Sequence, residues 1–286
     1  MIIAISFNSC KTSYSYKDKI WLINMSRIPP DHPRYLSLVT RDKVVEGVKI
    51  GITDIHGLIA HGRGETFDYL IGEKTTDMAA YAQRAAVAML LLAERPVISV
   101  NGNTAALVPD ELVTLADITR ATLEVNLFHR SEARIHKIIR HLKSRGAGVV
   151  LGHKGDARLD LSHGRAIVDK DGIYSADVML VPLEDGDRCQ TLVNMDKKVI
   201  TIDLNPLSRT SLSATVSIVD NIIRSIPNMI QFAIDMKGVE PDRLQKVVDM
   251  YDNRKVLSSA MYEINEILKN EAVRQGIPWN NFPEDE

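Results

Sequence analysis

Six short, mostly apolar runs recur through the middle of the chain, and segments of helical periodicity separate them. The runs are largely continuous rather than alternating, which is typical of strands buried on both faces of a sheet. Strands that alternate with helices predict an α/β three-layer sandwich with a mostly parallel sheet. The predicted strands are VISV (97–100), LEVNLF (123–128), GVVLG (148–152), DVMLVPL (177–183), KVITIDL (198–204) and TVSIV (215–219).

Helix signals lie before, between and after these strands. Asp31 and Pro33 are typical of a helix start, and apolar residues follow at helical spacing up to Gly51. Asp77 is predicted to cap a helix that is apolar on nearly all sides and should be buried. Further helices are predicted over 109–119, from Ser131 to Gly146, and over 220–236 with a kink at Pro227.

Two internal stretches and the chain ends lack this rhythm. Residues 57–75 and 156–176 are rich in polar residues and glycine, so we predict loops there. Residues 1–24 precede a second methionine and predict an extension or a mis-called start, with an ordered strand as the alternative. Residues 25–238 then form the main domain. Residues 239–286 predict a helical tail, whose apolar stripe packs on that domain or on a second subunit: Leu257, Met261, Ile264 and Leu268.

Composition removes several classes of protein. The chain has 286 residues, of which 45% are hydrophobic and 25% charged, so a disordered chain is excluded. A formal net charge of −2 offers no global basic field for nucleic acid or an anionic membrane. No apolar run reaches the roughly 18 residues of a membrane helix. Two cysteines, Cys10 and Cys189, exclude a disulfide scaffold and favour a cytoplasmic protein.

Polar residues follow several predicted strands, at the edge where ligands bind in open parallel sheets. Asn101, Asn103 and Thr104 come after the first strand and suit either an anion site or an ordinary turn. Asp203 and the run NPLSRTS (205–211), which contains Arg209, come after the fifth. An arginine among hydroxyl groups can hold phosphate oxygens, although such a run can also be plain surface.

Two further segments carry charge. Asp185 and Asp187, in the segment EDGDR after the fourth strand, suit Mg²⁺ binding or the cap of the next helix. Arg63 lies between glycines in GRGETF, which suits a phosphate-closing loop or a plain surface loop. That segment is not a dinucleotide fingerprint, because its third glycine is missing. The chain also lacks a P-loop and a Gly-x-Ser-x-Gly elbow.

Six strings together resemble one enzyme family, the archaeal phosphopantothenate synthetases or 4-phosphopantoate–β-alanine ligases. The resemblance covers about residues 28–236, and its motifs are long and occur in order. They are IPPDHPRYLSLVTRDKVVEGV, GLIAHGRGETFDYLIGEKT, PVISVNGNTAALVP, LEVNLFHR, VPLEDGDR and VITIDLNPLSRTS.

The resemblance implies a Rossmann-like homodimer of coenzyme A biosynthesis that joins 4-phosphopantoate to β-alanine with ATP, releasing AMP and diphosphate. An acyl-adenylate and Mg²⁺ are expected. The positions that match the family's ATP contacts are Arg41, Arg63, Asp203, Leu204, Asn205, Arg209, Thr210, Asn221 and Ile222. Candidates for 4-phosphopantoate and β-alanine are Asn101, Asn103 and Asn126, with Lys74 and Arg130 as candidate catalytic residues.

Other readings of the same sheet remain open at this point. An ATP-dependent phosphotransferase of the same pathway would make ADP rather than AMP. A non-catalytic nucleotide-binding module would consume no ATP, and a nicotinamide oxidoreductase would use a similar fold for different chemistry.

Overall fold

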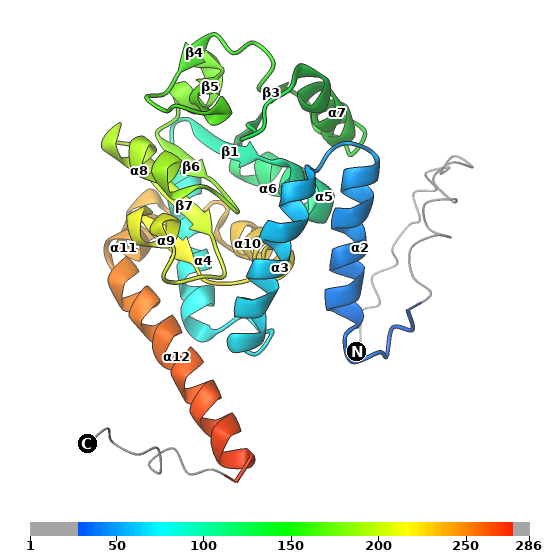
Figure 1. Ribbon diagram of the computed structural model, residues 1–286. Coiled ribbons are helices and arrows are strands. Elements are labelled where there is room, and N and C mark those ends of the chain that lie inside the picture. The colour runs from blue at the N-terminus through cyan, green and yellow to red at the C-terminus, as the bar shows by residue number, and fades with distance from the viewer. Residues whose placement is uncertain (1–27, 277–286) are drawn as a thin grey trace, which may run out of the picture. The chain divides into compact units, whose positions relative to one another are not determined.

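The computed structural model describes residues 28–276, and Figure 1 shows the order of their elements. The prediction for residues 1–24 falls outside these residues. The chain divides after Asp42 into two compact units. The described part of the first unit holds a turn and the beginning of α2 (Tyr35–Lys49), the helix expected between residues 31 and 51. The second unit contains the sheet and every other element.

The sheet has six strands, all parallel, in the order β3-β2-β1-β6-β7-β8. Counted along the chain, this is the order 3-2-1-4-5-6 of a classic doubly wound fold, and it reverses between β1 and β6. All six predicted strands are confirmed. Their bounds are β1 (Pro96–Val100), β2 (Thr122–Val125), β3 (Val150–Leu151), β6 (Val178–Leu180), β7 (Lys198–Ile202) and β8 (Val216–Ile218).

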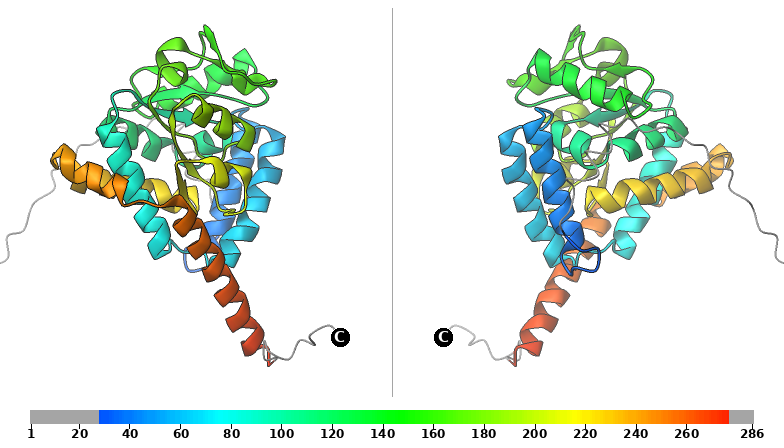
Figure 2. Two further views of the ribbon diagram at one scale, coloured as in Figure 1. Left: turned by 90° about the vertical axis from the view of Figure 1, so that its left-hand side faces the viewer. Right: turned by 90° about the vertical axis from the view of Figure 1, so that its right-hand side faces the viewer.

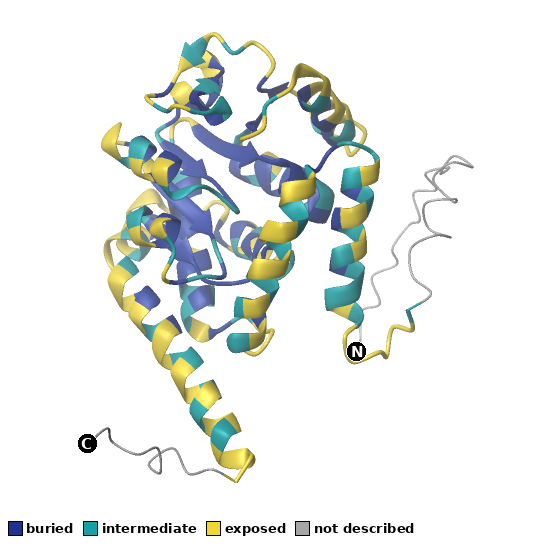
Figure 3. Cartoon of the chain, in the orientation of Figure 1, coloured by how far each residue is buried: buried dark blue, intermediate teal, exposed yellow. Residues whose placement is uncertain are grey.

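Successive residues of these strands face two separate apolar cores. Ile98 and Val100 of β1 face the larger core, and Val97 faces the smaller one. The first face is covered by helices α4 (Asp77–Leu92), α6 (Pro109–Thr119), α7 (Glu132–Lys143) and α10 (Ile222–Met236). The second face packs against α8 (Gly186–Asn194) and a π-helical segment (Lys170–Tyr174). The strands are therefore buried on both faces, as their continuous apolar runs predict (Figure 3).

Helices account for most of the remaining chain. Ser131 caps α7 as predicted, and α10 contains Pro227. Thr76, rather than the adjacent Asp77, caps α4 through its hydroxyl. The bounds are α3 (Ile55–Leu70), α4 (Asp77–Leu92), α5 (Gly102–Leu107), α6 (Pro109–Thr119), α7 (Glu132–Lys143), α8 (Gly186–Asn194), α9 (Arg209–Ser213), α10 (Ile222–Met236), α11 (Pro241–Asp249) and α12 (Asn253–Arg274).

The predicted loop over 57–75 is wrong, because most of it is helix α3. Asp54 caps this helix by accepting a hydrogen bond from the backbone N–H of His56 (3.1 Å). Glycine lowers helix propensity by only about 1 kcal/mol each, which packing can outweigh. Gly57 is needed for packing, since a β-carbon there would lie 2.3 Å from Asn103 Oδ1. Gly57 therefore allows a close approach between α3 and Asn103.

Two other boundaries also differ from prediction. The stretch 156–176 contains a small antiparallel pair, β4 (Ala157–Arg158) and β5 (Ile167–Val168), as well as helical turns. Strand β2 ends at Val125, three residues before its predicted end, and Gly152 approaches it closely at this point. A β-carbon on Gly152 would lie 2.3 Å from the Val125 carbonyl oxygen.

The C-terminal tail is helical, as predicted, and consists of α11 and α12. The first turns of α12 are buried through Val256, Leu257 and Ala260. Beyond them the helix extends away from the sheet, as both views of Figure 2 show. The predicted apolar stripe therefore divides, because Leu257 is buried whereas Leu268 is 45% exposed.

Candidate functional site

The turn after β7 is organised by Asp203. Its Oδ1 accepts a hydrogen bond from the backbone N–H of Asn205 (3.0 Å), and its Oδ2 accepts one from the Ser208 hydroxyl (2.5 Å). Burial raises the pKa of Asp203, although these bonds and the positive charge of Arg63 oppose the shift. The turn is therefore held in one conformation by its own side chains.

Helix α3 brings the GRGETF segment to this turn. A β-carbon on Gly64 would lie 3.5 Å from Cδ1 of Leu204, and Arg63 interacts electrostatically with Asp203. The Arg63 side chain is exposed. Two segments that are far apart in sequence, and that the family resemblance assigns to ATP, thus lie side by side.

Helix α9 adds a second exposed arginine at the same edge. Ser208 caps this helix by accepting a hydrogen bond from the backbone N–H of Ser211 (3.0 Å), and Arg209 is its first residue. Thr210 is buried and donates its hydroxyl to the Glu184 carbonyl (2.9 Å). A β-carbon on Gly186 would lie 2.5 Å from Cβ of Arg209, so the segments that follow β6 and β7 are in close contact.

Asn221, after β8, caps α10 and is buried. Its side-chain amide donates to Asp68 on α3 (2.7 Å), and Arg224 joins Asp68 to Asp220. Burial raises the pKa of Asp220 against the opposing effect of Arg224. The neighbouring Ile222 is also buried. The Asn221 backbone is engaged as well, because its N–H donates to Asp220 Oδ1 (2.7 Å) and its carbonyl accepts from the backbone N–H of Arg224 (3.0 Å).

Asn101 lies where the strand order reverses, between β1 and β6. It forms a capping box with Thr104 at the start of α5. Its Nδ2 donates to the carbonyls of Pro182 (3.0 Å) and Leu183 (3.2 Å), beyond the end of β6. The Asn101 side chain is therefore fully used in joining the two strand ends.

The other two predicted substrate residues are also hydrogen-bonded within the protein. Asn103 donates to the Gly57 carbonyl (2.9 Å) at the start of α3. Asn126 is fully buried and donates to the carbonyls of Arg165 (3.2 Å) and Ile167 (3.1 Å), which leaves its Oδ1 without a partner. That unpaired acceptor is one of the few groups here that a ligand can satisfy.

Arg130 follows the end of β2 and is largely buried, with 9% of its side chain exposed. Its Nη2 donates to the Gly152 carbonyl beyond β3 (3.0 Å), whereas its Nη1 is buried without a partner. A buried, unpaired guanidinium N–H is costly, so this atom is a strong candidate for bonding a substrate oxygen.

The two predicted Mg²⁺ ligands are already engaged by other side chains. Asp185 Oδ2 lies 2.6 Å from Nε of Arg165, and Asp187 Oδ2 lies 3.0 Å from Nε2 of His163. Burial acts to raise the pKa of Asp187, but its bonds to His163 and to the Arg188 backbone outweigh this and lower it. In this arrangement the two carboxylates do not fit a magnesium site.

A buried ion network behind these acids was not anticipated from the sequence. Glu184 and Arg188, one helical turn apart, are both fully buried and hydrogen-bonded to each other. Arg165 also pairs with Glu184 (3.0 Å), and Arg188 donates to Ser99 of β1 (3.3 Å). The i,i+4 spacing of Glu184 and Arg188 was the only sequence signal of this pair.

Lys74 and Arg41 are the last two predicted site residues, and neither belongs to the buried ion network. Lys74 forms an ion pair with Glu263 of α12 (3.3 Å), and 60% of its side chain is exposed. Arg41 lies on α2 within the first unit and is half-buried.

The parallel sheet, its strand order and the polar residues beyond its carboxyl edge define a Rossmann-type α/β protein. The family described as phosphopantothenate/pantothenate synthetase matches residues 78–267. The chain belongs to this family.

Similar proteins match almost the whole chain. A relative from Methanosarcina mazei is 63% identical over 252 residues, which is 88% of this chain and 100% of the relative. Relatives from Thermococcus kodakarensis and Thermococcus onnurineus are 52% and 51% identical over 246 residues, covering 85% of this chain and 94% of each relative. All three are named 4-phosphopantoate–beta-alanine ligase. Within residues 28–276, no helix is long and apolar enough to cross a membrane.

Proposed function

We propose that this protein is an ATP-dependent 4-phosphopantoate–β-alanine ligase, an enzyme of coenzyme A biosynthesis that forms a carbon–nitrogen bond. The observation that carries the proposal is the 63% identity with a ligase of that name, which extends over the relative's full length. The small-molecule substrates need neither a nucleic-acid nor a membrane surface, in keeping with the net charge of −2. The low cysteine content supports a cytoplasmic location.

ATP is proposed to bind beyond β7 and β8. Two exposed arginines, Arg63 and Arg209, flank the turn at Asp203 and suit the triphosphate. Asp203 and Asn205 are suited to hydrogen-bond the ribose or base. Thr210, Leu204 and Ile222 complete the proposed contacts, and Asn221 and Arg41 are included on the family resemblance.

4-Phosphopantoate and β-alanine are proposed to bind on the other half of the edge, beyond β1 to β3. The unpaired Nη1 of Arg130 and the unpaired Oδ1 of Asn126 support this assignment. Asn101 and Asn103 are proposed to shape this half through their hydrogen bonds to neighbouring carbonyls. Lys74 remains a candidate for a catalytic cation.

The reaction proceeds in two proposed steps. The 4-phosphopantoate carboxylate attacks the α-phosphorus of ATP, so that an acyl-adenylate forms and diphosphate leaves. The uncharged amine of β-alanine then attacks the acyl carbon, the amide forms, and AMP leaves with the bonding electrons. The chain's own contribution is to hold anionic reactants together and to neutralise charge that develops on phosphate oxygens.

Mg²⁺ is proposed to arrive with ATP and to be held mainly by phosphate oxygens, as is common for this ion. Asp185 and Asp187 would bind it only after leaving Arg165 and His163, so we derive no step through them.

Product analysis by chromatography tests the reaction. The protein is incubated with ATP, Mg²⁺, 4-phosphopantoate and β-alanine, and each component is omitted in turn. AMP, diphosphate and 4′-phosphopantothenate should appear together, and only in the complete mixture. ADP without an amide product would instead indicate a phosphotransferase, and absence of turnover would contradict the proposal.

A homodimer is proposed as the working form, with the outer part of α12 at the interface. Met261 and Leu268 are exposed on this helix and lie on one face of it. Leu268→Asp should convert a dimer to a monomer in light scattering, whereas Asn270→Asp on the opposite face should not. An unchanged dimer in Leu268→Asp would remove α12 from the interface.

A further inference from the structure

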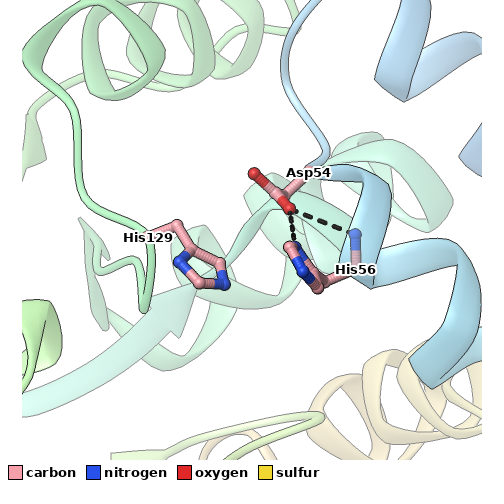
Figure 4. A group of neighbouring side chains, drawn as sticks. All are labelled: Asp54, His56 and His129. Carbon is pink, nitrogen blue, oxygen red and sulfur yellow. Dashed lines mark hydrogen bonds and ion pairs between the residues drawn. The ribbon is translucent and has the colours of Figure 1, made fainter.

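Three side chains with metal-ligating atoms meet where α3 begins and β2 ends (Figure 4). They are Asp54, His56 and His129, and one ligand atom from each lies within 4.8 Å of the others. Asp54 Oδ1 is 2.6 Å from Nδ1 of His56, and the rings of His56 and His129 have centroids 4.8 Å apart. None of the three belongs to the residues assigned to ATP, 4-phosphopantoate or β-alanine.

The carboxylate of this group is held from behind. Arg134 Nη1 donates to Asp54 Oδ2 (2.9 Å), which leaves Oδ1 directed to His56. Burial alone would raise the pKa of Asp54. The hydrogen bonds from His56 and the charge of Arg134 outweigh burial, so the pKa is lower than usual. Such support of a ligand by a second hydrogen bond is characteristic of metal sites, because it fixes the orientation of the ligand.

The geometry points to a binding site for one divalent first-row transition-metal ion, such as Zn²⁺, formed by Asp54, His56 and His129. Imidazole and carboxylate together suit Zn²⁺, Co²⁺ or Ni²⁺, whereas Mg²⁺ prefers oxygen ligands alone. Three protein ligands leave further positions for water. The His56 side chain is 67% exposed, so solvent can reach them.

Binding requires only small movements. Bonds of roughly 2.1 Å in a tetrahedral site place ligand atoms about 3.4 Å apart, so the exposed rings need to rotate by a short distance. The ion would replace the hydrogen bond between Asp54 and His56, because the ligand atoms of a metal must be deprotonated. The bound ion would fasten the start of α3, the helix of Arg63, to the loop that carries Arg130.

Calorimetry with ZnCl₂ tests this inference on a metal-free chain without a histidine tag. The background carries Cys10→Ser, so that its thiol adds no ligand. Cys189 needs no change, because burial raises the pKa of its thiol to about 12. We expect one equivalent to bind at pH 7.5, and His56→Ala and His129→Ala each to weaken it at least tenfold. His136→Ala, an exposed control on α7, should leave the affinity unchanged.

A parallel titration with Co²⁺ identifies the ligands by visible absorption. Spectra typical of nitrogen and oxygen ligands should appear and persist in excess Mg²⁺. Binding that survives unchanged in the His56→Ala/His129→Ala double variant would overturn the site, as would the absence of binding below millimolar Zn²⁺. Circular dichroism of each variant establishes that it is folded. These readouts do not depend on ligase activity, so the site and the proposed function can fail separately.

Discussion

The two halves of the sheet's carboxyl edge are built in opposite ways. Beyond β7 the cations Arg63 and Arg209 are exposed and stand over a turn that Asp203 holds in place. Beyond β1 and β2 the cations are buried, and Arg130 and Arg165 keep only 9% and 7% of their side chains exposed. In the first half the positive charges are exposed to solvent, whereas in the second half most polar side-chain atoms are hydrogen-bonded within the protein.

This difference predicts whether an arginine substitution should act mainly on turnover or mainly on stability. An exposed arginine can be removed with little cost to folding, and its loss should appear in binding or turnover. A buried, paired arginine cannot, because its removal leaves the partner's charge without compensation. Variants of the two kinds therefore test the comparison.

The largest effect is expected at the fully buried Arg188. Arg188→Met should lower the free energy of unfolding by about 3–5 kcal/mol in urea, because Glu184 is left charged and partly unpaired. Arg254→Met, an exposed change on α12, should stay within about 0.5 kcal/mol. Adding Glu184→Gln should restore part of the loss. If Arg188→Met alone is as stable as the unchanged chain, the buried ion network contributes little to the free energy of unfolding.

Turnover should respond most strongly to the exposed arginines. Arg63→Ala and Arg209→Ala should each lower kcat/KM for ATP about a hundredfold, since each removes a cation from the proposed triphosphate site. Their unfolding curves should match that of the unchanged chain. Arg95→Ala is the matched control, because this exposed arginine precedes β1 at the opposite edge of the sheet. If Arg209→Ala binds and consumes ATP normally, the ATP assignment is wrong.

The buried half should also show a pH dependence of stability through Glu124 on β2. Burial raises the pKa of Glu124 to about 7, against hydrogen bonds from the backbone N–H groups of Ile173 and Asp169. Between about pH 4.5 and pH 7, Glu124 is therefore protonated in the folded state and ionised in the unfolded state. This contribution is complete below about pH 4.5 and is lost as the pH rises through 7.

Urea unfolding at pH 5.5 and pH 8 measures this loss. The chain should lose about 2 kcal/mol more than Glu124→Gln over this interval, since the variant cannot titrate at that position. Comparing the two proteins cancels the histidines that titrate in the same range. Equal losses in both would mean that Glu124 is ionised throughout.

A smaller and selective effect is expected at Arg130. Arg130→Lys keeps the charge but removes the planar fork that reaches both the Gly152 carbonyl and the proposed substrate. KM for 4-phosphopantoate should rise about tenfold in initial-rate measurements, while KM for ATP should not change. If KM for ATP rises instead, Arg130 belongs to the ATP site and its assignment to 4-phosphopantoate is wrong.

Lys74 should have the smallest effect on stability. Its ion pair with Glu263 is exposed, and such pairs contribute less than about 1 kcal/mol. Lys74→Ala should therefore unfold almost as the unchanged chain does and yet turn over more slowly if the residue is catalytic. Normal turnover would end the catalytic assignment.

The sequence predicted the exposed half of the edge better than the buried half. Apolar runs located all six strands, and the polar turn at Asp203 with Arg209 was visible as a pattern. Helix α3 was missed because its glycines resemble a loop locally, whereas one of them, Gly57, is required by close packing against Asn103. The ion pair of Glu184 with Arg188 was missed because burial depends on tertiary packing, which a local pattern does not contain.

The hydrogen bonds of Asn101 bear on the precision of a reaction whose partners are proposed to bind on the two halves. Reacting atoms must be held about 3–3.5 Å apart, and a misplacement of 1 Å can cost roughly a hundredfold in rate. Asn101 spans from the end of β1 to the carbonyls of Pro182 and Leu183 beyond β6. This side chain therefore adds a fixed link between the two strand ends, beside the backbone pairing of β1 with β6. With the substrates placed as proposed, part of their alignment would already be present in the protein before either substrate binds.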